Sequence, residues 1–236
     1  LLIDAGHQPL IAYLTSFVEQ NPHDQYGGLY LSIVAKSYLD LNAPEIARYY
    51  YERVVNGYAD VTIEERSLRK EALEQLVRLS PDPEERVEYY RTLLAEYGDE
   101  VDRGRIYYRL AENLALLGEW EAVYDAYRSF LRYPDVSIPG EPNAYRIIEN
   151  RVEFHDSPKN WTMATLEDLQ RTITWALINK DTRTLARYQA GVNFFTRSWE
   201  QDFDDPNSTP LWNVQEILRN TPRAIRVRRE IELDTD

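Results

Sequence analysis

The sequence contains no cysteine, and this absence excludes three kinds of chemistry. Without a thiol the chain forms no disulfide bond, no thiolate zinc site and no cysteine nucleophile. Histidine is scarce too, because only His7, His23 and His155 occur. These histidines share no metal-ligand spacing with one another or with an acidic pair. We therefore expect no metal site.

Glycine is also scarce, with only 9 residues, and none of them form a loop that would cradle a phosphate group. The sequence has no nucleophile elbow, and no catalytic pair stands out among its 40 acidic residues. The acidic stretch at residues 202–208 resembles a calcium loop but lacks the glycine turn and the distal glutamate. We interpret that stretch as a surface loop, and expect neither a cofactor nor an enzyme.

Long apolar runs and an excess of positive charge are missing as well. No run approaches the roughly 18 to 20 apolar residues that cross a bilayer. The 27 basic residues are outnumbered by 40 acidic ones, which gives a net charge of −13. Nucleic acids and anionic membranes bind cationic surfaces. We therefore expect no membrane span in this chain and no nucleic-acid partner.

Charge and aromatic residues divide the chain into two regions. Residues 1–141 carry 25 acidic and 14 basic side chains, whereas the remainder carries 15 and 13. Of the 18 tyrosines, 17 lie at or before Tyr145, while four of the five tryptophans lie from Trp161 onward. This difference predicts a first domain at 1–153, a linker at 154–161 and a second domain at 162–236.

The first region contains an internal repeat. Its anchors Phe17, Val54, Leu93 and Phe130 are separated by 37, 39 and 37 residues. Each anchor follows three residues after Leu14, Tyr51, Tyr90 or Tyr127, and apolar residues around it recur at helical spacing. Turn-forming residues separate the segments, including Asn42, Pro44, Pro81, Pro83 and Gly118. The region is thus predicted to be a series of helix–turn–helix units.

The repeat resembles a known family. Two units match the tetratricopeptide repeat pattern, in which a large-x2-Leu-small-x2-aromatic helix precedes a small-x3-aromatic helix. One runs from Leu31 through Ala35 to Tyr51, and the other from Tyr107 through Ala111 to Tyr127. The middle unit is divergent, since Arg86 stands where a small residue is expected. The resemblance implies a mainly α protein whose first region is a tetratricopeptide-like solenoid. Tyr51 is then expected between helices, as packing rather than as an aromatic binding surface.

Proteins of this family bind extended partners along the concave face formed by the first helix of each unit. Carrying the groove-facing spacing over residue by residue gives eight candidate positions. They are Leu29, Ser32, Lys36, Arg66, Arg69, Arg105, Tyr108 and Glu112. The four cations among them would form a basic stripe that suits an acidic peptide. The alternative is a solvated helix face with ordinary charge pairs.

The C-terminal region contains sequence patterns of both helices and strands. The sequence predicts a helix at 142–154, a capped helix after Thr165, a shorter helix after Asp181 and a helix after Thr209. Strands are predicted at 192–199 and 224–233 from their β-branched and alternating residues. This order indicates a small α+β domain. The stretch from Ala176 to Leu185 faintly resembles the start of the nuclear-transport-factor-like cone fold.

These observations favour a noncatalytic scaffold that binds a protein or peptide partner. An alternative is a ligand-binding or catalytic cone with a cavity lined by Trp175, Phe194, Phe195 and Trp199, for which the repeats are a docking appendage. A third is self-association through a tyrosine-rich face. The repeat style resembles that of bacterial envelope lipoproteins, which implies a periplasmic or envelope location and a longer parent protein. The other location considered is the cytoplasm.

Overall fold

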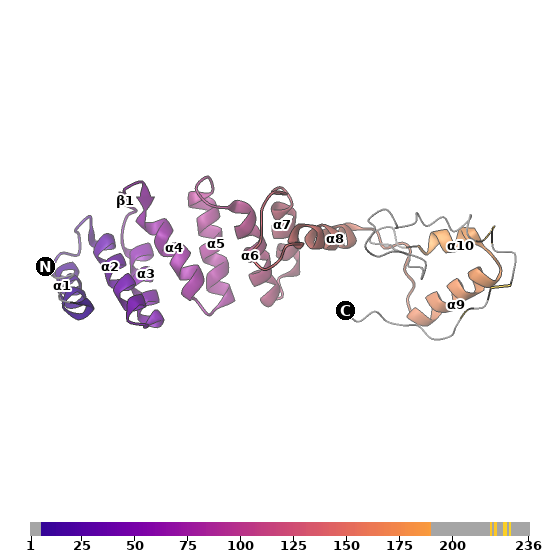
Figure 1. Cartoon of the computed structure of the whole chain (residues 1–236), viewed down its shortest axis with the longest axis horizontal. Helices are drawn as coiled ribbons and strands as arrows, with labels where there is room; N and C mark the ends of the chain where they lie inside the picture. The colour runs from indigo at the N-terminus through magenta and orange to yellow at the C-terminus, as the bar shows by residue number, and fades with distance from the viewer. Residues whose placement is uncertain (1–5, 190–217, 219, 221–223, 226, 228–236) are drawn as a thin grey trace. The chain divides into compact units, whose positions relative to one another are not determined.

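The computed structural model of the chain describes residues 6–189, 218, 220, 224, 225 and 227, and these residues are mainly helical (Figure 1). The chain divides into two units, residues 1–145 (unit 1) and residues 146–236 (unit 2). The strands predicted at 192–199 and most of the one at 224–233 lie outside the described residues, as does the helix expected after Thr209 apart from Leu218 and Asn220.

Unit 1 contains seven helices and one small hairpin among its described residues. In chain order they are α1 (His7–Gln20), α2 (Gly27–Asp40), α3 (Pro44–Gly57), β1 (Thr62–Ile63), β2 (Arg66–Ser67), α4 (Leu68–Leu79), α5 (Pro83–Tyr97), α6 (Arg103–Leu116) and α7 (Trp120–Phe130). A further helix, α8 (Ala144–Asp156), begins at the end of this unit and takes up the first three residues of the predicted linker.

Helices α1 to α7 lie in a row in the order of the sequence (Figure 1). Each helix packs against the next one, and α2 also contacts α4. Figure 1 places α1 and α7 at opposite ends of this row. The seven helices therefore do not close into a bundle around one central core.

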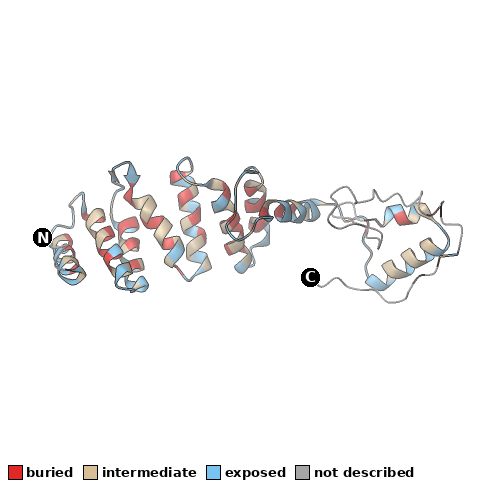
Figure 2. Ribbon diagram, viewed as in Figure 1, coloured by how far each residue is buried: buried red, intermediate tan, exposed pale blue. Residues whose placement is uncertain are grey.

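A continuous apolar core joins the first five helices. Figure 2 shows buried residues, coloured red, along the helices of unit 1. The core between α1 and α5 comprises Val18, Leu31, Ala35, Ala47, Tyr51, Val54, Val55, Ala72, Leu73, Leu76, Leu93 and Tyr97. The alanines Ala35, Ala47 and Ala72 are fully buried, as close helix packing requires.

The aromatic repeat positions are packing residues, as predicted. Tyr51, Tyr90 and Tyr127 are all buried, at 1%, 9% and 6% exposure. Tyr49, two residues before Tyr51, is instead 54% exposed. The three consecutive tyrosines therefore face different surroundings, and only Tyr51 lies deep between helices.

Two of the helix pairs are joined by the same kind of turn. After α2, Asn42 adopts a φ of 56°, and after α6, Gly118 adopts a φ of 74°. In both turns two backbone N–H groups return to the last turn of the helix: Asn42 and Ala43 donate to Leu39 and Tyr38, and Gly118 and Glu119 to Ala115 and Leu114. This left-handed cap satisfies carbonyl groups that the helix end leaves free.

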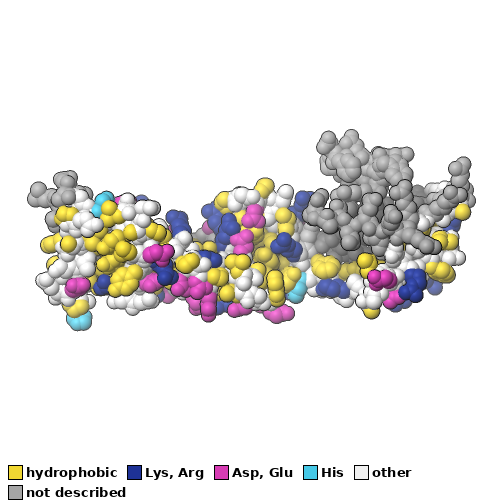
Figure 3. All heavy atoms as spheres, turned by 90° about the horizontal axis from the view of Figure 1, so that it is seen from below, with side chains coloured by type: hydrophobic (Ala, Val, Ile, Leu, Met, Phe, Trp, Pro, Cys, Tyr) yellow, Lys and Arg dark blue, Asp and Glu magenta, His cyan; other side chains and the backbone are white. Residues whose placement is uncertain are grey.

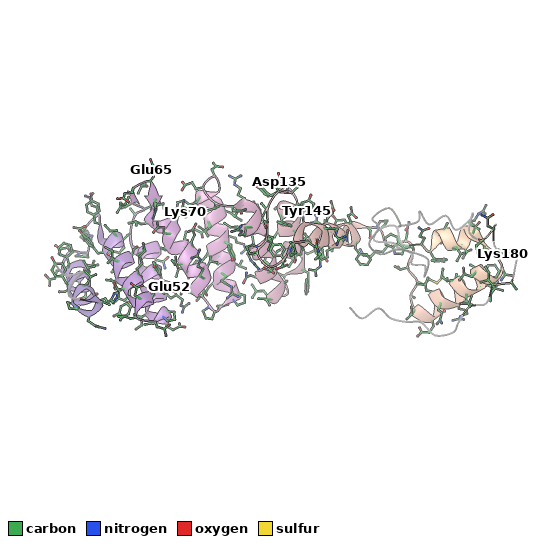
Figure 4. All side chains as sticks on the ribbon, in the orientation of Figure 1. Glu52, Glu65, Lys70, Asp135, Tyr145 and Lys180 are labelled. Atoms are coloured by element: carbon green, nitrogen blue, oxygen red, sulfur yellow. The ribbon has the colours of Figure 1, made fainter. Side chains whose placement is uncertain are left out.

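Helices α4 and α5 are joined differently. Helix α4 follows directly on the β1–β2 hairpin, whose tip is Glu64 and Glu65, both with positive φ; Glu65 is labelled in Figure 4. After α4, Ser80 has an extended backbone and the Pro81-Asp82-Pro83 segment starts α5 without a left-handed residue. The Asp82 side chain accepts a hydrogen bond from the Glu84 N–H and so caps α5.

The described part of unit 2 contains most of α8, followed after a turn-rich segment by α9 (Leu166–Ile178) and α10 (Thr182–Arg187). Thr165 and Asp181 cap these helices, as predicted. Lys180, with a φ of 51°, closes α9 with the same bonding pattern as Asn42 and Gly118. Ala176 and Leu185 are buried where the two helices pack together.

Candidate binding face

The candidate site of unit 1 lies where α2, α3 and α4 meet. A cavity of about 300 Å³ is lined there by Ser32, Lys36, Tyr51, Glu71, Glu74, Gln75 and Arg78. Two of these residues come from one face of α2, at a spacing of four, and four from one face of α4, at spacings of three and four. Helical periodicity alone therefore brings these six side chains to one surface.

A second cavity continues along the same side of α4. It measures about 390 Å³ and reaches α5 and α6 through Tyr90, Arg105 and Arg109. Glu74 and Arg78 line both cavities. The two hollows therefore form one face along α2, α4 and α6, the first helices of three successive helix pairs. Its lining combines charged side chains with apolar ones such as Val77, Leu93 and Ile106. We call this surface the α2–α4–α6 face.

Only some of the predicted groove residues line the two cavities. Ser32 and Lys36 line the first cavity and Arg105 lines the second. Leu29 is half-buried in α2. Arg66 lies exposed in β2, before α4 begins. Arg69 extends from the first turn of α4 to Glu96 of α5 and to the Val55 carbonyl oxygen.

At α6 the chain itself covers part of the predicted groove. Tyr108 is buried and its hydroxyl donates a hydrogen bond to Glu141, in the segment that follows α7. Glu112 is half-buried and pairs with Arg109 at 2.6 Å. A methyl group at Gly104 would come within 3 Å of Val136 and Tyr133 of the same segment. The segment after α7 therefore lies directly against α6.

Carboxylates accompany the predicted basic residues. The Lys36 ammonium lies 3.3 Å from Glu71, the Arg69 guanidinium 3.0 Å from Glu96, and that of Arg105 3.6 Å from Asp102. Lys70, labelled in Figure 4, reaches Glu100 at 2.7 Å. Acidic and basic side chains are likewise intermingled over α4 and α5 on the surface shown in Figure 3. The α2–α4–α6 face is therefore of mixed charge.

Sequence reasoning did not find Glu71, Glu74, Gln75 and Arg78. The groove-facing spacing of the family put Arg66 and Arg69 on the groove instead. In the structure α4 starts only at Leu68, because Ser67 caps it through a hydrogen bond to the Lys70 N–H. A usable signal was present, since the four polar residues recur at spacings of three and four opposite Leu73 and Leu76.

A hydrogen-bonded carboxylate fixes the entry to α4. Asp60 accepts hydrogen bonds from Ser67 Oγ at 2.7 Å, from Tyr97 Oη at 2.9 Å and from the Arg69 N–H at 3.1 Å. Burial acts to raise the pKa of Asp60, but these bonds outweigh it and hold that pKa below its usual value. Asp60 therefore ties β2, α4 and α5 together as a charged acceptor.

Unit 2 has a hollow of its own on α9. It measures about 530 Å³, and Trp175, Ile178 and Val227 are among the residues that line it. Trp175 is 56% exposed there. Phe194, Phe195 and Trp199, which were expected to line a cavity with it, lie outside the described residues.

The described residues hold no group of three or more metal-binding side chains. Among those same residues no helix is both long enough and apolar enough to span a bilayer. The acidic stretch at residues 202–208 lies outside them.

The comparisons with known proteins give no family. No family model, no curated protein and no solved structure matches this chain.

Proposed function

We propose that unit 1 is a noncatalytic scaffold that binds a protein partner along the α2–α4–α6 face. The observation that carries this proposal is the continuity of that face, since Glu74 and Arg78 belong to both of its cavities. An elongated surface of this kind accommodates an extended segment better than it would enclose a single small substrate.

A solenoid of tetratricopeptide-like helix pairs is the architecture that we propose for this unit. It is supported by the row of consecutively packed helices, by the contact of α2 with α4, and by the buried Tyr51, Tyr90 and Tyr127 at equivalent positions. In such an array the first helices of successive pairs lie side by side and leave one shared face open. The likeness to envelope lipoproteins, and the location that it implies, stay predictions.

Mixed charge on this face bears on the kind of partner. The basic stripe that would suit an acidic peptide is interleaved with Glu71, Glu74 and Asp102. A surface with both signs of charge selects a partner by the order of its charges more than by its net charge. The acidic partner stays a prediction, and a segment with alternating polar groups fits the observed face better.

A charge-reversal experiment tests the scaffold. The double variant Lys36→Glu/Arg105→Glu changes two positions of the face, one in each cavity. Its matched control is Arg91→Glu/Arg128→Glu, which makes the same charge change on α5 and α7, at residues that line neither cavity. Both variants should retain the helical circular dichroism signal of the wild type.

The measurement is affinity capture from an extract of the source organism. A protein recovered by wild type and control is then identified and its dissociation constant measured with purified components. We expect the face variant to bind it at least tenfold more weakly. Equal affinities of the face variant and the control would contradict the proposal.

A further inference from the structure

The turn between α6 and α7 exposes three large apolar side chains. Leu116 and Trp120 are 71% and 61% exposed, and Leu117, which follows Leu116 directly, is exposed as well. Single apolar residues scattered over a surface need no explanation, but several at one turn, with a tryptophan among them, are typical of a protein interface. We call residues 116–120 the α6–α7 turn.

The surroundings of Trp120 limit what this turn can bind. Glu119 and Glu121 stand on either side of Trp120 in the chain, and both are exposed. An acidic surface repels nucleic acids and anionic membranes. The α6–α7 turn therefore fits an apolar hollow on a polypeptide, with cations beside that hollow.

The second cavity of the α2–α4–α6 face is a hollow of this kind. Three arginines and three acidic side chains line it, so that it has no formal net charge and apolar groups can enter it without leaving a charge unpaired. Its volume of about 390 Å³ admits a leucine and a tryptophan side chain. The apolar residues of its wall are Val77, Leu93, Val101 and Ile106.

Leu116 lies on the same side of α6 as this cavity. Arg105 and Arg109, which line the cavity, are followed by Glu112 and Leu116 at spacings of three and four, so the four side chains form one stripe along the helix. All four are at least partly exposed. The first half of the stripe is basic, whereas its second half is acidic and apolar and continues into the α6–α7 turn. Such a stripe is self-complementary when two copies of it lie antiparallel.

We propose that the chain forms a symmetric dimer in which the α6 helices of two copies lie antiparallel. Arg109 of each copy then meets Glu112 of the other, and Leu116 and Trp120 of each copy enter the second cavity of the other. Because the same contacts are made twice about one axis, the assembly closes at two copies. This inference goes beyond the scaffold function, since it concerns a second copy of the chain and not a foreign partner.

Sedimentation velocity of the full chain tests the dimer. From micromolar to submillimolar protein at physiological salt, we expect the sedimentation coefficient to rise from that of a monomer to that of a dimer and to stay constant thereafter. Trp120→Ser should weaken dimerisation at least tenfold, because buried tryptophans contribute strongly to interface affinity. Trp175→Ser is the matched control on α9, where Trp175 is 56% exposed, and should leave dimerisation unchanged.

Three outcomes of this measurement would overturn the inference. They are a wild type that stays monomeric, a sedimentation coefficient that keeps rising with concentration, and a Trp120→Ser variant that dimerises as the wild type does. Trp120 is largely exposed, so its replacement should not impair folding, and the helical circular dichroism signal verifies this.

A charge exchange tests the antiparallel arrangement. Arg109→Glu and Glu112→Arg each place like charges opposite one another across the axis, so each variant alone should dimerise at least tenfold more weakly than the wild type. An equimolar mixture restores opposite charges at both contacts and should associate at least tenfold more tightly than either variant alone. Fluorescence-detected sedimentation with one labelled variant measures this gain.

Mixing separates an interface effect from a structural one, because a chain that is damaged internally is not repaired by a second chain. The absence of a gain from two folded variants would overturn the inference. If either variant does not fold, the comparison of Trp120→Ser with Trp175→Ser decides alone.

The dimer and the scaffold fail in different ways. A chain that dimerises through Trp120, but whose captured partner is insensitive to charge reversal of the face, retains the dimer and contradicts the scaffold. A chain that stays monomeric, but loses its captured partner on charge reversal, retains the scaffold and contradicts the dimer.

Discussion

Helices α2 and α3 form a pair with the same succession of elements as α4 and α5, yet the two pairs are held together by different means. The first uses a small residue, Ala47, fully buried at the start of its second helix, and a left-handed turn at Asn42. The second has Arg86 at the corresponding position. Its guanidinium donates to the Ser80 carbonyl oxygen at 2.8 Å and to Asn113 of α6 at 2.6 Å.

The difference shows how a repeat can diverge without losing its packing. In α4–α5 the long Arg86 side chain satisfies a carbonyl group at the end of α4 and at the same time joins α5 to the next pair. Ser80 adds hydrogen bonds to Glu85 and within the turn. Polar contacts thus replace the close apolar approach of α2 and α3, provided that every partner is present.

The largest loss of stability is expected when an arginine is introduced at position 47, in the α2–α3 pair. Ala47→Arg puts a charge at a fully buried position in the apolar core of unit 1. Burying an unpaired charge costs about 3 to 5 kcal/mol or more. Chemical denaturation should show this loss of stability, with Glu45→Arg on the same helix as an exposed control. A loss below about 1 kcal/mol would mean that the small residue is not required.

Removing Arg86 from the α4–α5 pair should reduce the stability by a smaller amount. Arg86→Ala leaves Asn113, which is buried, and the Ser80 carbonyl without a donor, at a cost of about 1 to 3 kcal/mol. In the double variant Arg86→Ala/Asn113→Ala the two losses should be less than additive, because both remove one interaction. Denaturation midpoints of the four proteins give this coupling energy. Strict additivity would show that the Arg86–Asn113 contact contributes nothing.

The left-handed turns should be the next most sensitive. Gly118→Ala introduces a side chain at a φ of 74°, although no atom lies within 4 Å of the added carbon. The cost is therefore conformational, about 1 to 2 kcal/mol. Gly57→Ala is the control, because that glycine has the same open surroundings without a positive φ. Thermal unfolding that ranks the two variants equally would contradict this account of the turn.

The smallest effect is expected at Asp60, and it should depend on pH. Asp60→Asn removes the charged acceptor of Ser67, Tyr97 and the Arg69 N–H and should cost about 1 kcal/mol at neutral pH, given the partial exposure of the site. The pKa of Asp60 is lower in the folded than in the unfolded chain. Its contribution is thus complete above the ordinary carboxyl pKa and disappears as the pH falls below about 4.

Unfolding curves of wild type and Asp60→Asn at several pH values measure this dependence. The two stabilities should differ most at pH 7 and approach each other as the pH falls below the ordinary carboxyl pKa. A difference that stays the same over that fall would assign the effect to geometry rather than to charge.

The sequence predicted the helix pairs because their determinants are local. Buried Tyr51, Tyr90 and Tyr127 recur at fixed spacing, and Asn42, Pro44 and Gly118 mark turns that follow from backbone preferences. The candidate face was predicted only in part. Ser32, Lys36 and Arg105 lie on it. Arg66 does not, because the β1–β2 hairpin takes up its position before α4 begins, and the polar residues of α4 on the face were not predicted.

The sequence could not predict which individual polar atoms form hydrogen bonds with one another. The Tyr51 hydroxyl, for example, is buried without a hydrogen-bond partner among the described residues, and no local pattern of the sequence predicts this. The cover over Tyr108 depends on a long-range contact with Glu141. Such pairings are decided by tertiary packing, so they become visible only when the helices are assembled.

The segment that follows α7 limits the surface that α6 leaves open. Through its contacts at Gly104 and Tyr108, it covers part of α6 with the chain's own residues. A side chain that is packed against its own chain has no free surface to offer to a second molecule. A partner bound along α6 would therefore meet Arg105 and Arg109 and not Tyr108.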